Sequence, residues 1–311
     1  MSSSILPILG ARGKPIMNVI SALFSLQPLP KTFGAIVTDV RLNDIDDSLF
    51  AELYRVWLQY ALLIFPGQHL SDAEQAVFAR RFGDLVEGLE AVELSNVLPD
   101  GRLRDAPDDD MMKIIRGNMH WHQDNTYMPI QAKGAVFSAK VVPKAQGDTA
   151  FADMRAAWDE LDELTREQIA GLSAYHSLAH SQRQLGEETK GNDSEYIGYG
   201  LDVESAPLRP LLKIHPETGR KTLAIGRHAY GIPGLSEEES ARLLEYLVQF
   251  SVSDDHRTYQ HRWNQGDLVV WDNRCLLHRA CAWDYAEPRV MLHSRIAGNP
   301  ATESALPTYP S

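Results

Sequence analysis

The chain of 311 residues carries a formal charge of −12 at pH 7, and 44% of its residues are apolar. This acidic balance argues against a general nucleic-acid binder, which should be basic, although one pocket can still be locally basic. No apolar stretch reaches the ~20 residues that span a bilayer. With two cysteines, Cys275 and Cys281, the sequence excludes a disulfide framework and a cysteine-based zinc site, and it fits a reducing, cytoplasmic location.

The sequence predicts one domain over residues 29–311, because no linker rich in Pro, Gly or Ser divides the chain and no internal repeat is present. Residues 1–28 contain no Asp or Glu and are interpreted as an N-terminal extension packed on the domain, with a targeting segment as the alternative. Residues 176–205 are polar and irregular. A segment of this length in a compact domain is usually functional or mobile, so we interpret it as a lid-like insertion.

Short strands dominate the predicted elements. We expect strands over 34–40, 61–65, 134–142, 148–153, 268–271 and 289–296, and a hairpin over 208–225. Helices are expected over 46–60, 71–83, 155–172 and 236–250, a loop over 84–110, and extended chain over 111–128. Because strands and helices do not alternate, a doubly wound sheet is disfavoured. The pattern predicts a mainly β fold with flanking helices and a jelly-roll core, the double-stranded β-helix.

A candidate metal site lies in residues 118–128, where His122, Gln123 and Asp124 form a His-x-Asp motif. In extended chain, residues i and i+2 point to the same face, so an imidazole and a carboxylate are presented together. A non-haem Fe(II) typically takes two histidines and one carboxylate on one face. The motif alone is unspecific. A second pattern of this kind, His215 and Glu217, lies in a predicted hairpin turn, and we interpret both residues as solvated.

A third ligand and a likeness to a known family appear near the C-terminus. Residues 269–280 read VVWDNRCLLHRA, a strand followed by a loop and His278, and Arg289 comes eleven residues later. His-x-Asp, Trp-Asp-Asn-Arg-x-x-x-His and this arginine resemble the Fe(II)/2-oxoglutarate dioxygenases of the taurine dioxygenase and 2,4-dichlorophenoxyacetate dioxygenase type. The segments GAIVTDV, LLIFPGQ, FARRFG and GDTAFADM follow in the family's order. Residues 117–119 and 225–228 look like the dichlorprop (aryloxypropionate) branch.

The resemblance implies a role for five residues. His122, Asp124 and His278 would bind Fe(II), and Arg289 and Thr149 would hold the distal carboxylate of 2-oxoglutarate. Elementary chemistry agrees with these roles. 2-Oxoglutarate can fill two open positions of the metal with its 1-carboxylate and keto oxygen, which leaves one position for O₂. Its far carboxylate then needs a fixed partner, and the planar fork of arginine matches a carboxylate.

One position departs from the family's pattern. Taurine and 2,4-dichlorophenoxyacetate dioxygenases carry a second arginine, four residues after the first, that anchors the acid group of the substrate. Here that position is His293. An imidazole is a weaker anchor for a sulfonate than a guanidinium, so the sequence argues against taurine as the substrate.

Other residues are candidates for substrate contact. Asn118 ranks first because it matches a substrate-contacting position of the family. Tyr127 is as consistent with the core as with the pocket. His120 could share the face of His122 and line the pocket or support that ligand. An acidic substrate could be anchored by a cation, although each of the three candidates also fits an ordinary solvated side chain: Lys113, Arg116 and Arg227.

The function that the resemblance implies is oxidation of a C–H bond in a small, carboxylate-bearing substrate, with release of succinate and CO₂. Aryloxyalkanoate hydroxylation with ether cleavage is the lead prediction. A biosynthetic oxidase that hydroxylates, desaturates or cyclises an amino acid or related acid is the alternative. A non-catalytic jelly-roll binding protein and a non-redox metal enzyme are further rivals. We expect a homo-oligomer, because family members often form dimers or tetramers, and no nucleic-acid or membrane partner.

Overall fold

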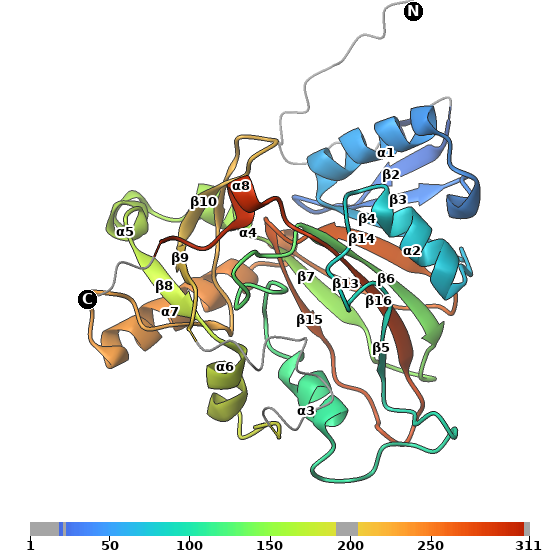
Figure 1. Cartoon of the computed structure of the whole chain (residues 1–311). Helices are drawn as coiled ribbons and strands as arrows, with labels where there is room; N and C mark the ends of the chain where they lie inside the picture. Colours follow the sequence, from blue (N-terminus) through green and yellow to red (C-terminus); the bar gives the residue numbers. More distant parts are fainter. Residues whose placement is uncertain (1–18, 21–22, 191–204, 308–311) are drawn as a thin grey trace, which may run out of the picture.

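Two facing β-sheets form the centre of the molecule, and helices lie outside them (Figure 1). The computed structural model describes residues 19–20, 23–190 and 205–307. The larger sheet has the strand order β1-β2-β3-β4-β14-β6-β16-β5, and the smaller has the order β13-β7-β15. The larger sheet comprises β1 (Val19–Ile20), β2 (Ser25–Pro28), β3 (Ala35–Thr38), β4 (Leu62–Phe65), β5 (Val92–Ser95), β6 (Gly134–Val141), β14 (Leu268–Asp272) and β16 (Val290–Ile296). The smaller comprises β7 (Thr149–Asp153), β13 (Thr258–His261) and β15 (Leu276–Ala280).

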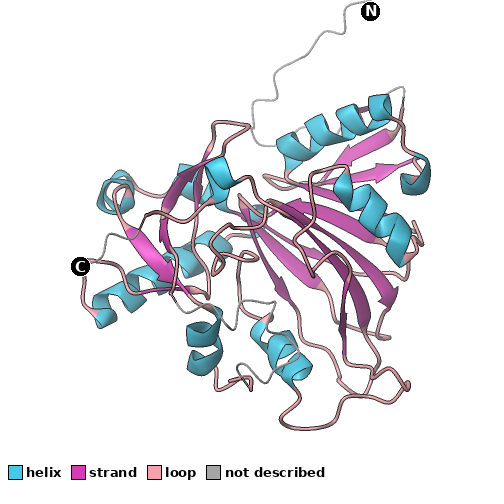
Figure 2. Cartoon of the chain, viewed as in Figure 1, coloured by secondary structure: helices cyan, strands magenta, loops and turns pink. Residues whose placement is uncertain are grey.

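Helices and two small sheets surround this core (Figure 2). The small sheets have the strand orders β12-β8-β9 and β10-β11. Their strands are β8 (Ser173–His176), β9 (Leu208–Pro210), β10 (Leu212–Ile214), β11 (Lys221–Leu223) and β12 (Ala229–Tyr230). The helices are α1 (Asp47–Tyr60), α2 (Asp72–Arg80), α3 (Asp110–Gly117), α4 (Met154–Glu160), α5 (Glu163–Ile169), α6 (Leu178–Gln184), α7 (Glu237–Val252) and α8 (Pro300–Glu303). Within the described residues, no helix combines the length and apolarity needed to cross a membrane.

Strand β14 shows why a continuous apolar run lies at the centre of the fold. It pairs with β4 on one side and β6 on the other, and all five of its residues are buried. Its side chains alternate between two cores. Val269 and Trp271 pack in the cluster between the sheets, and Leu268 and Val270 pack in the cluster beneath α1 and α2. A strand covered on both faces needs apolar residues at every position.

The prediction of a mainly β fold with flanking helices and a jelly-roll core is confirmed, although three predicted elements are wrong. Residues 111–117 were expected to be extended, but they belong to helix α3. The Asp109 carboxylate accepts from the backbone N–H of Met112 at 2.9 Å and caps this helix. Its apolar residues Met111, Met112, Ile114 and Ile115 are buried. The end of the predicted loop over 84–110 therefore contributes the cap of this helix.

The predicted helix over 155–172 is two helices, α4 and α5, which meet at Leu161. Asp162 begins the second helix by accepting from the backbone N–H of Thr165 at 2.9 Å. A single helix over 155–172 would bury Leu164 with Trp158 and Leu161, but in α5 this side chain is 79% exposed. The segment 84–110, expected to be a loop, includes β5, which pairs with β16.

The structure describes part of the predicted N-terminal extension and part of the predicted lid-like insertion. Strand β2 pairs with β3 in the larger sheet, and Phe24 and Leu26 are buried. The sheet therefore includes residues that the sequence placed in the N-terminal extension 1–28, of which 1–18 and 21–22 lie outside the described residues. In the predicted insertion 176–205, helix α6 is described and residues 191–204 are not. The lid-like role stays a prediction.

Replacing Ser71 with alanine is expected to lower the free energy of unfolding by about 1 kcal/mol, the usual cost of losing a helix N-cap. Ser71 and Glu74 form a reciprocal capping box at the start of α2, which packs against β16. Urea unfolding measures the change. Ser48→Ala, at an exposed position inside α1, is the matched control and should leave the midpoint unchanged or slightly raised. Equal destabilisation by both variants would contradict the capping role.

Candidate active site

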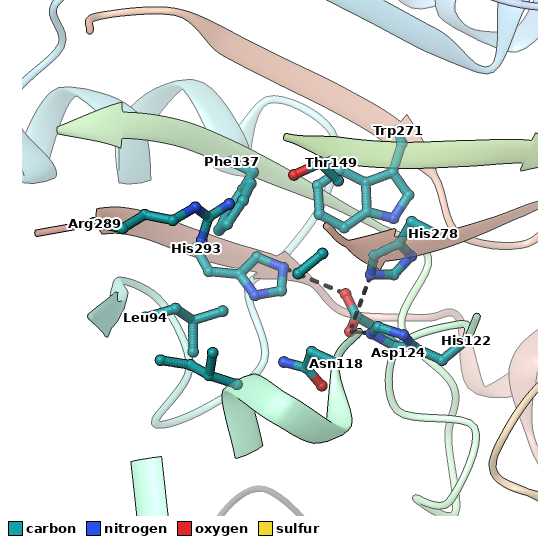
Figure 3. A pocket seen from close by; sticks show the side chains of 12 residues that line it. Leu94, Asn118, His122, Asp124, Phe137, Thr149, Trp271, His278, Arg289 and His293 are labelled. Atoms are coloured by element: carbon teal, nitrogen blue, oxygen red, sulfur yellow. Dashed lines mark ion pairs between the residues drawn. The ribbon is translucent and has the colours of Figure 1, made fainter. Parts of the chain in front are cut away.

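The predicted metal ligands meet between the two sheets. His122 and Asp124 lie in the loop between α3 and β6, and His278 lies in the middle of β15. The backbones of His122 and His278 form an antiparallel bridge, with N···O distances of 3.0 and 2.9 Å. This bridge holds the loop against the strand, so the three side chains point to one place (Figure 3).

The geometry of these three side chains fits one metal ion. Oδ1 of Asp124 lies 3.9 Å from Nε2 of His122 and 3.7 Å from Nε2 of His278. All three residues are buried, and one ligand atom from each lies within 4.8 Å of the others. Metal bonds of about 2 Å put neighbouring ligands of one ion roughly 3 to 4 Å apart. Two imidazoles and one carboxylate leave coordination positions open for substrates.

The local electrostatics keep these residues in their metal-binding protonation states. Burial lowers the pKa of His122 well below its usual range and that of His278 to about 4. Burial would raise the pKa of Asp124, but His278, Arg295 and His293 outweigh it and hold that pKa well below its usual range. At neutral pH the imidazoles are neutral and the carboxylate is ionised, as metal ligation requires.

The same cavity contains a buried cation. Arg289 is 4% exposed, and its Nε donates to the carbonyl of Gly147 at 2.9 Å. Its guanidinium carbon lies 5.0 Å from the centre of the Trp283 ring. Burial lowers the pKa of Arg289 to about 10, which leaves it charged at neutral pH. One terminal nitrogen of this guanidinium is buried and makes no hydrogen bond within the described chain. A buried, charged donor of this kind requires an anionic partner.

Thr149 and Gly147 complete this end of the cavity. The Thr149 hydroxyl accepts from Nε1 of Trp263 at 3.0 Å, so its own proton remains available to a ligand. Gly147 has φ +71°, and a Cβ there would lie 2.8 Å from the Pro143 ring and 3.3 Å from the Arg289 side chain. Only glycine fits this turn with Arg289 in place.

The cavity joins the candidate metal ligands to Arg289, and its empty space of about 490 Å³ includes the open solvent at its mouth. Its remaining walls are largely apolar and include Leu94, Ile115, Phe137, Trp271 and Ala280. Sequence reasoning did not find these residues. Leu94 lies in a strand that was expected to be a loop. Trp271 carried a usable signal, because the two-residue period of β14 places it on the inner face with Val269.

His293 lies beside the candidate metal ligands in this cavity (Figure 3). Its Nε2 is 3.3 Å from Oδ2 of Asp124, and its ring stacks on Trp271 with centroids 5.5 Å apart. Burial lowers the pKa of His293, which makes the imidazole neutral at pH 7. A neutral ring held against Asp124 is a poor anchor for an acidic substrate, in agreement with the prediction against taurine.

The other predicted substrate residues differ in position. Asn118 lines the cavity. Tyr127 is 4% exposed and packs edge-on against His228, with centroids 4.8 Å apart, so it belongs to the core around the site. The His120 side chain is exposed and does not line the cavity, but its carbonyl oxygen lies 2.8 Å from Nδ1 of His122. His120 therefore orients the His122 ring through its backbone.

The three candidate cations are held in different ways. Arg116 makes a two-point ion pair with Glu187 at 2.6 and 2.7 Å. The Lys113 ammonium lies 3.9 Å from the Asp110 carboxylate. Arg227 lies beside the bridge between His122 and His278, because its backbone N–H donates to the carbonyl of Trp121 at 2.9 Å. Of these three cations, Arg227 is therefore tied by its backbone to Trp121, the residue directly before His122.

The interpretation of His215 as a solvated turn residue is wrong, whereas Glu217 is exposed in the turn, as the sequence predicted. They do lie in the turn between β10 and β11, but His215 is 2% exposed and its Nε2 lies 2.9 Å from the Asp272 carboxylate. Glu217 accepts from Arg274 at 2.6 Å. His215, Asp272 and Cys275 also bring ligand atoms within 4.8 Å of one another. Arg274 already neutralises Asp272 with paired bonds of 2.8 and 2.7 Å, so this cluster is a buried ion pair.

Comparison with known proteins identifies the family. The model of the taurine catabolism dioxygenase TauD, TfdA family matches residues 25–295. The chain belongs to this family. It is therefore an Fe(II)/2-oxoglutarate-dependent dioxygenase with a jelly-roll core, as the sequence predicted, and it needs Fe(II), 2-oxoglutarate and O₂.

Individual TauD/TfdA relatives cover nearly the whole chain. An (S)-phenoxypropionate/alpha-ketoglutarate-dioxygenase of Sphingobium herbicidovorans is 57% identical over 92% of this chain and 99% of its own. The alpha-ketoglutarate-dependent 2,4-dichlorophenoxyacetate dioxygenase of Cupriavidus pinatubonensis is 34% identical over 84% and 93%. A crystal structure of AAD-2 in complex with Mn(II) and N-oxalylglycine has a TM-score of 0.82 at 33% identity, covering 92% of this chain and 99% of that one.

Proposed function

We propose that this dioxygenase oxidises a small aryloxyalkanoic acid, with Fe(II) held by His122, Asp124 and His278 and the far carboxylate of 2-oxoglutarate held by Arg289 and Thr149. The observation that carries the proposal is the presence of a neutral-histidine and carboxylate donor set and a buried, incompletely paired guanidinium in one cavity. The metal would supply O₂ activation coupled to decarboxylation of 2-oxoglutarate.

The protein's own residues would orient the reactants and exclude water. Arg289 and Thr149 would fix one end of 2-oxoglutarate, so its keto acid end reaches the metal ligands. The apolar walls, Phe137 and Trp271 among them, would keep bulk water from the reacting centre. Insertion of oxygen at the carbon that bears the ether oxygen gives an unstable hemiketal or hemiacetal. Its collapse releases a phenol and a 2-oxo acid, together with succinate and CO₂ from 2-oxoglutarate.

The apolar walls favour a substrate with a ring, and Arg227 would anchor its carboxylate. One terminal nitrogen of Arg227 donates to Oε1 of Gln182 at 2.7 Å, whereas its buried Nε makes no hydrogen bond within the described chain. A Cβ on Gly117 would lie 2.5 Å from Nη1 of Arg227, so this guanidinium packs against the last residue of α3, directly before Asn118 of the cavity wall. Arg116 is occupied by Glu187, and His293 is neutral, so Arg227 supports an anionic substrate best.

Replacing Arg227 with glutamine is expected to raise the KM for the aryloxy acid about 30-fold or more, because a charge-assisted contact worth about 2 kcal/mol or more is lost. The KM for 2-oxoglutarate should stay near the wild-type value. Steady-state kinetics of succinate formation measure both constants. Arg116→Gln, at the cation paired with Glu187, is the matched control and should leave the KM for the acid unchanged. An unchanged KM in Arg227→Gln would exclude this anchor.

A substrate panel with mass spectrometry tests the proposed function. The two enantiomers of 2-phenoxypropionate, phenoxyacetate, taurine and free amino acids would each be incubated with Fe(II), 2-oxoglutarate and O₂. We expect a phenol and one equivalent of succinate from an aryloxy acid, and no turnover of taurine. A product two mass units lighter or sixteen units heavier from an amino acid alone would favour the biosynthetic alternative.

Two further predictions concern the whole protein. Both cysteines are free, which supports the proposed cytoplasmic location. We also propose a homo-oligomer, as is usual in the family. Sedimentation velocity of the full chain would decide between a monomer of 34.8 kDa and a larger assembly.

A further inference from the structure

Two buried asparagine side chains hold the two halves of the site. Asn273 lies in the turn between β14 and β15, and Asn96 directly follows β5. Both are 0% exposed, and neither lines the cavity. Sequence reasoning gave neither residue a role. Each side-chain amide is bonded to the backbone of a residue that carries the proposed chemistry.

Asn273 binds the backbone of Asp124 from both sides. Its Oδ1 accepts from the N–H of Asp124 at 2.7 Å, and its Nδ2 donates to the carbonyl of Asp124 at 2.9 Å. The second proton of Nδ2 goes to the carbonyl of Ala132 at 2.9 Å. The amide therefore acts on Asp124 as a neighbouring strand would, and it fixes the position of the peptide units from which the carboxylate projects.

Asp124 needs this support because it does not belong to a strand. The backbone bridge to His278 secures His122, whereas Asp124 lies two residues further on in a turn. The next residue, Asn125, has φ +56°. The turn that carries Asn273 is itself held in place. The carboxylate of Asp272 is bonded to the backbone N–H and the guanidinium of Arg274 and to His215.

Asn96 makes the corresponding contacts with Arg289. Its Oδ1 accepts from the backbone N–H of Arg289 at 2.7 Å. Its Nδ2 donates to the carbonyls of Tyr285 and Glu287 at 3.1 and 3.0 Å, and its own N–H donates to the carbonyl of Arg289 at 3.3 Å. The amide thus fixes the chain that enters β16, where the guanidinium begins its path into the cavity.

We propose that Asn273 and Asn96 are separate positioning residues, the first for the metal ion and the second for the far carboxylate of 2-oxoglutarate. The inference rests on the proposed ligand roles of Asp124 and Arg289. Neither amide touches a reactant. Each amide fixes the backbone that carries a functional side chain. The carboxylate or guanidinium at the end of that side chain must lie within a few tenths of an ångström of its position against its partner.

The test compares Asn273→Ala with Asn96→Ala in the full chain. Fe(II) affinity is measured anaerobically by competition with a chelator, and 2-oxoglutarate affinity by titrating the Fe(II)-loaded protein and following the metal-to-ligand charge-transfer band. We expect Asn273→Ala to weaken Fe(II) binding about 10- to 100-fold, the usual effect of losing a group that orients a metal ligand. We expect Asn96→Ala to bind Fe(II) as wild type and 2-oxoglutarate about tenfold more weakly.

Two additional measurements keep the test decisive. Asn273→Asp is the substitute variant if Asn273→Ala does not fold. Its side chain has nearly the same shape and keeps the acceptor but loses both donors, so we expect it to weaken Fe(II) binding as well. Hydrogen exchange of the Asp124 amide in metal-free protein should speed up in Asn273→Ala and stay unchanged in Asn96→Ala. Equal losses of both affinities in both variants, or no loss in either, would overturn the proposal. Absence of the band in wild-type protein would instead refute the proposed function.

Discussion

Replacing Asp124 with alanine is expected to reduce Fe(II) affinity and turnover by at least about 100-fold. Loss of a group that only supports a metal ligand costs about 10- to 100-fold, and loss of a ligand should cost more. The Asp124 carboxylate is the only anionic member of the proposed donor set, and without it two neutral imidazoles face the ion. The charge-transfer band of the Fe(II)–2-oxoglutarate complex should disappear. Anaerobic titration of the metal-free protein with Fe(II) and then 2-oxoglutarate measures both effects.

Asp110→Asn is the matched control for this variant. Asp110 is also a buried carboxylate, 7% exposed, but it lies at the start of α3 outside the donor set. This control should retain the band and near-normal Fe(II) affinity. A wild-type band in Asp124→Ala would show that another side chain completes the metal site, and it would refute the assignment of His122, Asp124 and His278 as ligands.

Replacing Arg289 with alanine is expected to weaken 2-oxoglutarate binding by about 30- to 5,000-fold, since removing one partner of a buried charge pair costs about 2–5 kcal/mol. Fe(II) binding should change little, because Arg289 lies at the other end of the cavity (Figure 3). Titration of the charge-transfer band with 2-oxoglutarate gives the affinity, and succinate formation gives its KM.

Arg289→Lys separates charge from shape at this position. A lysine keeps the positive charge but cannot offer the planar fork, so its 2-oxoglutarate affinity should lie between those of wild type and Arg289→Ala. Turnover in Arg289→Ala with unchanged dependence on 2-oxoglutarate would exclude this residue as the anchor. Together with Asp124→Ala, the variants test the metal and 2-oxoglutarate halves of the site independently.

The surroundings of His293 bear on where the acid group of the substrate binds. This residue lines the cavity together with Arg289, which directly precedes β16. Its Nε2 lies 3.3 Å from Oδ2 of Asp124. Because the ring is neutral and faces a proposed ligand, the family's arginine position here supports the metal side of the cavity. The acid group of the substrate therefore has to be bound elsewhere, and Arg227 is the proposed location.

The sequence by itself determined the features that depend on residue type and short spacing. Continuous apolar runs predicted the buried strands β4, β6 and β14, and the capping boxes at Ser71 and Ser236 predicted the starts of α2 and α7. The motif residues and their order predicted the family and the cofactors. These signals are local, because a strand covered on both faces and a helix N-terminus each need particular residues wherever they occur.

Only the tertiary structure decided which polar residues meet. His215 and His122 each precede a carboxylate residue by two positions, yet one hydrogen-bonds with Asp272 and the other faces Asp124 and His278. The structure also placed α3 where an extended segment was expected, and it brought Asn273 and Asn96 onto the backbones of Asp124 and Arg289. These contacts join residues 149 and 193 positions apart. Their formation depends on how the sheets pair, which no local pattern in the chain encodes.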